Sequence, residues 1–227
     1  MSTIIIATPH DRNNQIEQRL SERFTNHRFL RIRNKEELCL SLLEQIQPEF
    51  IFFPHWSWLI PEDIHTRYEC IIFHMTDLPY GRGGSPLQNL IVRGHTETQL
   101  TALKCVSELD AGPIYCKKHL SLEGTAEEIL RRASHLIEDI IAEILIQKPN
   151  PQPQQGTPII FKRRNRSDGN IASLKTLKEI YDFIRMLDAD SYPPAFVETE
   201  YWKFEFNDAH IAEDSLYAKV RIRKKDV

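Results

Sequence analysis

The sequence predicts an α/β protein: a Rossmann-like, doubly wound and mostly parallel sheet, followed by a small C-terminal α+β subdomain. Short β-rich runs alternate with stretches of helical periodicity in the first third of the chain. These runs are apolar throughout, as is typical of strands covered on both faces. Near the C-terminus, apolar and polar residues alternate instead, which predicts half-exposed strands of a separate subdomain.

The first predicted elements follow the order β-α-β-α-β. The helical stretches carry apolar residues at a spacing of three or four, and the last begins with proline and two acids, a favourable first turn. The predicted strands are Thr3–Ala7, Phe50–Phe53 and Cys70–Phe73, and the predicted helices lie around Ile16–Phe24, over Glu36–Ile46 and from Pro61.

Two further strands and a long helix follow. Thr98–Val106 and Ile114–Leu122 have strand composition, and they are joined around the turn Asp110-Ala-Gly-Pro. Thr125 and Glu128 then form a T-x-x-E capping box, which predicts a helix start. An apolar stripe from Ile129 to Leu145 predicts that this helix runs to about residue 147.

The chain is expected to divide at a proline- and glutamine-rich segment. We expect a catalytic domain over residues 1–147, a semi-extended linker over 148–158 and a small subdomain over 159–227. Within the subdomain, Leu174–Leu187 reads as a short amphipathic helix, and alternation follows from Trp202 and again from Tyr217.

Composition excludes several classes of protein. The 29 basic and 32 acidic residues give a net charge of -3, which provides no general field for nucleic acid. No segment approaches the roughly 20 apolar residues of a membrane span. The N-terminus lacks the basic region of a signal peptide. We therefore expect a cytoplasmic protein that binds neither nucleic acid nor membrane.

Neither cysteine nor histidine spacing indicates a metal site. The four cysteines are far apart and lie in or beside apolar runs, where a reduced cysteine behaves as a small hydrophobe; they are Cys39, Cys70, Cys105 and Cys116. The nine histidines show no H-E-x-x-H or similar spacing. We predict no metal.

Polar, titratable residues follow two of the buried strands. His55 and His74 lie at the carboxyl ends of strands, where ligands bind in open α/β sheets. Asp110 lies in a turn before Ala-Gly, and a carboxylate beside a histidine would orient its ring and stabilise its charged form. A gap of 36 residues cannot establish that pairing by spacing alone. A core histidine and a self-capping turn aspartate are the alternatives.

These residues occur in an order that resembles the folate-dependent formyltransferases. His74, Leu78-Pro79, Arg82-Gly83 and Leu109-Asp110-Ala-Gly follow one another as in that family, and the capped helix from Thr125 comes next. The resemblance covers about residues 1–147. It implies that 10-formyltetrahydrofolate is the co-substrate, that a primary amine is the acceptor, and that His74 and Asp110 are the catalytic residues.

The resemblance also implies the positions of two binding regions. The folate would lie against the loop after the second buried strand and the loop that carries the aspartate, which supply His55, Trp56, Trp58 and Leu109. For the tryptophans and His55, plain packing is the alternative. Thr76, Arg82 and Gly83 would contact the acceptor. Arg82 either meets a substrate phosphate through its planar fork or holds the loop.

One residue departs from the family pattern. The family has asparagine two residues before the histidine, where its amide is thought to hydrogen-bond the transferred formyl oxygen, and this chain has Ile72. Losing such a donor costs a few kcal/mol of oxyanion stabilisation, about 3 in typical cases, if nothing replaces it.

The resemblance leaves several acceptors and outcomes open. Only 69 residues follow the predicted linker, and their pattern is most like the sugar N-formyltransferases, which implies a nucleotide-linked amino-deoxy sugar as acceptor. A formyl-folate hydrolase and a non-catalytic folate- or nucleotide-sugar-binding homologue are the alternatives. Alternation at Trp202–Phe206 is compatible with a homodimer interface.

Overall fold

A run of isoleucines forms β1 (Ser2–Ala7), an inner strand of a mixed six-stranded sheet. In the computed structural model, which describes residues 1–225, Ile4, Ile5 and Ile6 are fully buried. A strand with no exposed apolar side chain must be covered on both faces. The continuous run therefore predicts the layered arrangement correctly.

The sheet has the strand order β2-β1-β3-β4-β6-β7. Its first four strands are parallel, and β6 pairs with β4 in the antiparallel sense, with His74 opposite Thr101. The predicted doubly wound, mostly parallel sheet is thus confirmed. The strands beside β1 are β2 (His27–Ile32), β3 (Phe50–Phe53), β4 (Cys70–His74), β6 (Glu97–Lys104) and β7 (Ile114–Ser121).

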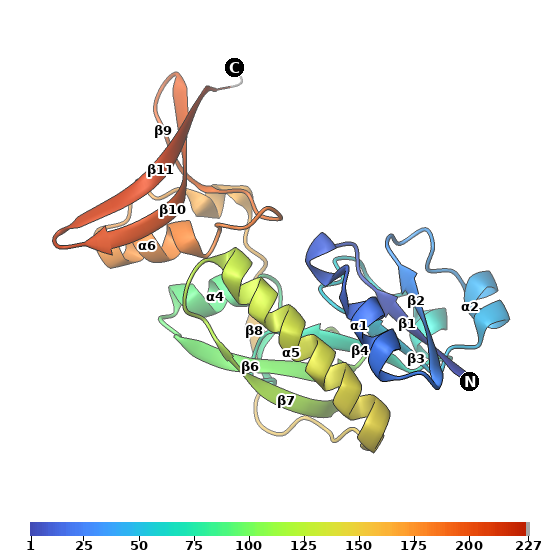
Figure 1. The fold of residues 1–227 in the computed structure, drawn as a ribbon. Helices are drawn as coiled ribbons and strands as arrows, with labels where there is room; N and C mark the ends of the chain where they lie inside the picture. The colour runs from blue at the N-terminus through green and yellow to red at the C-terminus, as the bar shows by residue number, and fades with distance from the viewer. Residues whose placement is uncertain (226–227) are drawn as a thin grey trace. The chain divides into compact units, whose positions relative to one another are not determined.

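Helices occupy most of the connections between these strands (Figure 1). The connecting helices are α1 (Ile16–Arg23), α2 (Leu40–Ile46), α3 (Glu62–His65) and α4 (Pro86–Val92), with the short 3-10 turn η1 (Asp11–Asn13). After the last strand of this sheet come α5 (Ala126–Gln147), the 3-10 turn η2 (Arg166–Gly169) and α6 (Leu177–Arg185). The Thr125 capping box forms, since the Glu128 N–H donates to Thr125 Oγ1 at 3.3 Å and the Thr125 N–H to Glu128 Oε2 at 2.8 Å.

Ion pairs place α5 beside β7 and α1. Lys118 on β7 donates to Glu143 at 2.6 Å, and Arg19 on α1 donates to Glu138 at 2.7 Å. Meanwhile the apolar stripe of α5, including Ile137, Ile140 and Ile144, is fully buried. The helix thus follows its sequence pattern, with one face in the core and polar contacts along its border.

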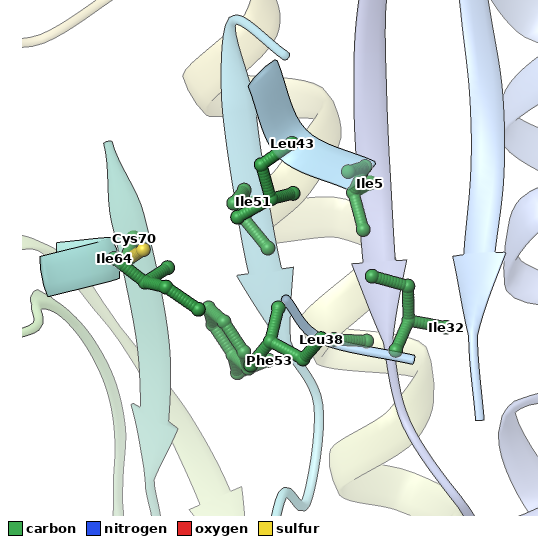
Figure 2. Close-up of a cluster of buried hydrophobic side chains, with 9 residues drawn as sticks. Ile5, Ile32, Leu38, Leu43, Ile51, Phe53, Ile64 and Cys70 are labelled. Carbon is green, nitrogen blue, oxygen red and sulfur yellow. The ribbon is translucent and has the colours of Figure 1, made fainter. Parts of the chain in front are cut away.

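A cluster of apolar side chains fills one side of the parallel strands, as Figure 2 shows. Ile5, Ile51, Phe53 and Cys70 reach it from β1, β3 and β4, while Leu43 on α2 is one of the side chains that cover it. Removing side chains of this size from water stabilises the fold by about 2 kcal/mol each. The same packing fixes where the strands end.

The C-terminal segment forms a three-stranded antiparallel sheet with α6 against it (Figure 1). Its strands are β9 (Ala195–Glu198), β10 (Trp202–Ala212) and β11 (Ser215–Lys224). Ile171, Ile184 and Ala195 are buried at the centre of its own apolar cluster. The predicted small α+β subdomain is confirmed.

A separate two-stranded sheet pairs β5 (Tyr80–Gly83) with β8 (Ile159–Phe161).

The chain divides into two compact units that do not follow one cut in the sequence. The first unit contains Met1–Arg82, Gln99–Leu120 and Arg131–Ile160. The second contains Gly83–Thr98, Ser121–Leu130 and the residues from Phe161 onward. The sequence placed a linker between two domains at residues 148–158. In the structure this proline- and glutamine-rich segment belongs to the first unit, so the division into units does not follow the expected linker.

Some elements differ from the sequence prediction. β2 was not predicted. Its buried residues Phe29 and Ile32 are three apart, and arginine and histidine fill half of its positions, so it has neither an apolar run nor strict alternation. It lies at the edge of the sheet, where one side stays unpaired. The second helix begins at Leu40 rather than Glu36, after turns in which Asn34 and Glu37 hydrogen-bond each other. Among the described residues, no helix is long and apolar enough to cross a bilayer.

We expect Phe53→Ala to lower the free energy of unfolding by about 3–5 kcal/mol, because it leaves a cavity in the cluster of Figure 2. Urea denaturation followed by circular dichroism measures this change. Leu59→Ala is the control, since Leu59 is 87% exposed and its truncation leaves no cavity. Equal effects of the two substitutions would contradict this account of the core.

Candidate functional site

His74 is the last residue of β4, and its side chain is enclosed. The residue is 8% exposed, and its Nε2 lies 2.7 Å from the carbonyl oxygen of Gly81. Beyond the strand, Thr101 Oγ1 donates to the carbonyl of Thr76 at 2.6 Å, which ties the following loop back to β6. The imidazole is therefore held by backbone groups of its own loop.

Asp110 approaches the other nitrogen of the same ring. Its Oδ2 lies 3.6 Å from His74 Nδ1, and the residue is 7% exposed. Asp110 has φ 53°, a left-handed conformation that aspartate tolerates better than most residues. The structure thus brings together a polar residue at the carboxyl end of β4 and another from the loop between β6 and β7.

The hydrogen bonds of the pair restrict where its protons can be. A carbonyl accepts only, so the Nε2–H of His74 donates to Gly81. In the neutral ring Nδ1 then carries a lone pair, and it faces a carboxylate of Asp110. Such a contact is attractive only when a further proton lies on one of the two groups. The pair is therefore buried, with Nδ1 of the ring directed at the carboxylate.

Close backbone packing returns the Asp110 loop to the sheet. A Cβ on Gly112 would lie 1.8 Å from the carbonyl oxygen of Lys104, so only glycine fits there. The Lys104 N–H donates to the Pro113 carbonyl at 2.9 Å, which closes the loop. The sequence Asp-Ala-Gly-Pro thus fixes the carboxylate two residues before a point of direct backbone contact.

Gln154 and Arg82 hold the same loop from outside. Gln154 Nε2 donates to the carbonyls of Asp110 (2.8 Å) and Gly112 (2.9 Å). Its Oε1 accepts from Arg82 Nε and Nη2 at 3.1 and 2.8 Å, while Arg82 Nη1 donates to Glu108 at 2.9 Å. The nitrogens of Arg82 are therefore engaged within the protein, as in the loop-holding alternative.

Sequence reasoning missed Gln154. It lies in the segment 148–158, where glutamine among prolines is typical of a solvated linker. The adjacent Gln152 exchanges two backbone hydrogen bonds with Ile114 at 2.7 and 2.8 Å, so this segment runs along β7. Nothing in the local pattern indicates this, because the partners are 40 or so residues earlier in the chain.

The remaining predicted acceptor residues lie in the loop after His74 or just beyond it. Thr76 is fully buried, with its Oγ1 3.5 Å from the Gly81 carbonyl. Gly83 has φ 104°, and a Cβ there would lie 2.5 Å from the carbonyl of Phe161. Close backbone packing thus requires glycine at position 83. Thr76 is buried within the loop that follows His74, beside the Gly81 carbonyl.

Ile72, the departure from the family pattern, faces the core. Its side chain is partly buried and packs against the cluster of Figure 2, together with Trp56 and Cys105. An apolar residue at this position therefore has a packing role. It supplies no hydrogen-bond donor beside His74.

The loop after β3 presents aromatic rings and polar atoms without hydrogen-bond partners. Trp56 and Trp58 are edge to face with centroids 4.8 Å apart, and Trp58 is 37% exposed. Trp56 Nε1 and His55 Nε2 are buried without a partner among the described residues. Leu109, on the Asp110 loop, is 58% exposed. Flat surfaces and orphaned donors of this kind fit a heteroaromatic ligand.

His55 is held in its neutral form. Burial, together with the positive charges of Arg12 and His10, lowers the pKa of its imidazole to about 3. Although the residue as a whole is half-buried, the Nε2 that would have to be solvated is inaccessible. His55 also has φ 52°, so its backbone is left-handed. It is therefore suited to hydrogen bonding and not to carrying charge near neutral pH.

Residues 1–225 contain no group of three or more His, Cys, Asp or Glu that could hold a metal ion. All four cysteines are free. Burial raises the pKa of the Cys105 and Cys116 thiols to about 11 and that of Cys70 higher still, so these side chains stay protonated and behave as apolar core.

Sequence comparison finds relatives of both parts of the chain. Residues 7–145 match the family described as formyl transferase, and residues 166–223 match the C-terminal domain of methionyl-tRNA formyltransferase. A methionyl-tRNA formyltransferase from Sulfurihydrogenibium sp. (strain YO3AOP1) is 24% identical over 197 residues. That match includes 83% of this chain and 62% of the relative, so the chain spans about three fifths of that relative's length.

Two solved structures are similar in fold. One, titled methionyl-tRNA formyltransferase from Clostridium thermocellum, superposes with a TM-score of 0.96 and 43% identity over 99% of this chain and 100% of its own. The other is the formyltransferase PseJ from Anoxybacillus kamchatkensis in complex with UDP-4,6-dideoxy-4-formamido-L-AltNAc and tetrahydrofolate. It superposes with a TM-score of 0.60 and 18% identity over 74% of this chain and 89% of its own.

We expect Gln154→Ala to lower the free energy of unfolding by about 1–3 kcal/mol, since it leaves the carbonyls of Asp110 and Gly112 without their donor. Gln152→Ala is the matched control, because the exposed Gln152 keeps its backbone bonds to Ile114. Urea denaturation compares the two. If both variants matched the wild type, Gln154 would not hold the loop.

We expect His55 to make the protein less stable in acid. Its pKa is lower in the folded state than the unfolded value of 6.5, so the unfolded chain binds the proton first and stability is lost as the pH falls below 6.5. Between pH 7.5 and 4.5 this amounts to about 2–3 kcal/mol. The measurement is the free energy of unfolding at both pH values.

The comparison variant is His55→Asn, since asparagine tolerates the left-handed backbone and does not titrate. The wild type should lose about 2–3 kcal/mol more than this variant over the same pH range. An equal loss in both proteins would mean that His55 protonates as readily in the folded state as in the unfolded one.

Proposed function

Since this chain belongs to the formyl transferase family, we propose that it transfers a formyl group from 10-formyltetrahydrofolate to the primary amine of a nucleotide-linked amino-deoxy sugar. The observation that carries the proposal is the buried His74–Asp110 pair, with Nδ1 and Oδ2 3.6 Å apart. Proton transfer to or from a reacting group requires such a unit, positioned and shielded from water.

The chemistry assigned to the pair follows from its protons. When bound, 10-formyltetrahydrofolate supplies an activated formyl group. As the acceptor nitrogen bonds to the formyl carbon, the bond from that carbon to the folate nitrogen breaks, and tetrahydrofolate leaves with a proton on that nitrogen. The balancing proton is lost by the acceptor amine. Asp110 Oδ2 and His74 Nδ1 can take that proton and share it, while the bond from His74 Nε2 to Gly81 keeps the ring in place.

The loop after β3 is assigned to the folate ring system. Trp58 and Leu109 offer exposed apolar surface, and the orphaned Trp56 Nε1 and His55 Nε2 offer polar contacts. Burial keeps His55 neutral, so its ring can hydrogen-bond a heterocycle without presenting a charge. These four residues thus have the chemistry that a pterin requires.

Charge in the C-terminal sheet favours a small acceptor over a nucleic acid. The hairpin of β10 and β11 carries five basic and four acidic residues. Lys219 pairs with Asp208 at 2.7 Å and Lys203 with Glu198 at 3.4 Å, while Arg223 pairs with Glu205. A tRNA-binding surface needs many uncompensated cations to neutralise phosphates. The PseJ complex, with a sugar nucleotide and tetrahydrofolate, is a precedent within the fold for the sugar acceptor.

Methionyl-tRNA is the second candidate acceptor. It is favoured by the similarity to the methionyl-tRNA formyltransferase from Clostridium thermocellum, which is 43% identical over 99% of this chain, and by the match of residues 166–223 to the C-terminal domain of methionyl-tRNA formyltransferase. If methionyl-tRNA is the acceptor, our expectation from the net charge that the protein binds no nucleic acid is wrong. The two acceptors differ in one decisive respect, because only the tRNA requires an extended contact with phosphates.

The decisive assay combines the purified chain, 10-formyltetrahydrofolate and separate acceptors: UDP- and dTDP-linked amino sugars, and methionyl-tRNA. Product mass identifies what is formylated. A formylated sugar supports the proposal, and formylated methionyl-tRNA supports the second candidate. Formate release without any amine would make the chain a hydrolase. Folate binding without turnover would contradict catalysis and make it a binding homologue.

We expect Asp110→Asn and His74→Ala each to reduce kcat by at least about 100-fold, because each removes one half of the proton-holding pair. Steady-state formyl transfer to the accepted substrate measures the change. His119→Ala is the matched control, since His119 is an exposed histidine of β7. Full activity in either pair variant would exclude the pair from the chemistry.

A further inference from the structure

The C-terminal sheet contains a cavity that takes no part in the proposed transfer. Its volume is about 400 Å³, and its walls come from η2, the segment before β9, and all three strands. Ligand pockets in proteins are typically about 300–1,000 Å³, so this cavity is large enough for a small metabolite.

Strand register explains which side chains line the cavity. Glu205 on β10 lies opposite Phe196 on β9 and opposite Arg221 on β11. In the next row on the same face, Lys203 lies opposite Arg223. Directly opposed residues of antiparallel strands point to the same side, so three cations gather on this face of the sheet. Arg166 of η2 adds a fourth.

The cavity is strongly cationic. Its lining carries four basic side chains and one carboxylate, that of Glu205. Glu205 is 6% exposed and is already paired with Arg223. Lys203 pairs with Glu198 at 3.4 Å and lies 3.7 Å above the ring of Phe196. Two of the four basic groups are thus compensated.

Arg166 and Arg221 are not compensated. Within residues 1–225, neither guanidinium has an ion pair with a carboxylate within 4.0 Å, although both line the same cavity. Two uncompensated like charges that share a cavity favour the entry of an anion. Guanidinium groups bind phosphate in a bidentate manner, so a phosphorylated ligand fits this arrangement best.

The rest of the lining indicates what the phosphates are attached to. Pro193, Pro194 and Phe196 offer apolar surface, and Asn207 offers an amide that can both donate and accept. Flat apolar surface beside an amide suits a nucleobase and its sugar. Beyond the cavity, Lys219 is paired with Asp208 and Lys225 with Glu198, so these two neighbouring cations are compensated.

We propose that this cavity binds a nucleoside diphosphate, with its phosphates on Arg166 and Arg221 and its nucleoside against the apolar lining. This site is separate from the His74–Asp110 pair, and the proposal does not depend on formyl transfer. It makes the C-terminal unit a nucleotide-binding element in its own right.

Isothermal titration of the full chain with UDP, dTDP, ADP and inorganic pyrophosphate tests the proposal. The informative variant is Arg166→Gln/Arg221→Gln, in which two exposed side chains change and no buried contact is lost. Lys224→Gln is the matched control, because it removes the same kind of charge from β11 while lying opposite Trp202, on the other face. Asp110→Asn separates this site from the proposed catalytic one.

At least one nucleoside diphosphate should bind the wild type, the Lys224 variant and the Asp110 variant equally well. We expect the double arginine variant to bind it at least about 10-fold more weakly. Pyrophosphate should compete, with lower affinity than the nucleotide. Circular dichroism confirms that each variant is folded.

Three results would overturn the proposal. The first is no contribution from the two arginines, seen either as equal binding by the double arginine variant and the wild type or as no binding of any nucleotide at millimolar concentration. The second is equal affinity for pyrophosphate and nucleotide, which would leave no role for the apolar lining. The third is tighter binding of an RNA oligonucleotide, lost in the same variant, which would assign the surface to a polynucleotide.

Discussion

The arrangement of the first unit depends on one packing constraint: β1, β3 and β4 are parallel and apolar on both faces. Because Ile51 pairs with Ile5 and with Cys70, the three strands share one register, and their carboxyl ends lie at one edge of the sheet. His74 and the loop that carries His55 begin there. A polar residue can follow a strand of this kind only where the sheet ends, so the core itself decides where chemistry is possible.

The sequence predicted those parts of the molecule that are specified locally. The apolar run of β1, the Thr125 capping box and the alternation of β10 each depend on neighbours within a few residues, and each forms as predicted. The edge strand β2 was missed because its two buried residues are three apart and one of its sides has no partner strand. Local patterns carry no signal for an unpaired edge.

The site shows the same division between local and distant causes. His74 and Asp110 were singled out as a pair from their loop context and from family resemblance, and the structure places them 3.6 Å apart. Neither source indicated Gln154, because its contacts with Arg82 and Asp110 are made across 72 and 44 residues. Ile72 is explained by packing, since it extends the apolar cluster toward the site.

The clamp by Gln154 also has a consequence for the order in which a ribosome makes this chain. His74, Asp110 and the strands between them leave the exit tunnel first, but the donor to the Asp110 and Gly112 carbonyls is 44 and 42 residues further on. A nascent chain that stops short of Gln154 has the His74–Asp110 pair without this hydrogen-bonded support of the loop. The Asp110 loop therefore receives these hydrogen bonds only after the proline- and glutamine-rich segment 148–158, which has the composition of a linker, has been translated.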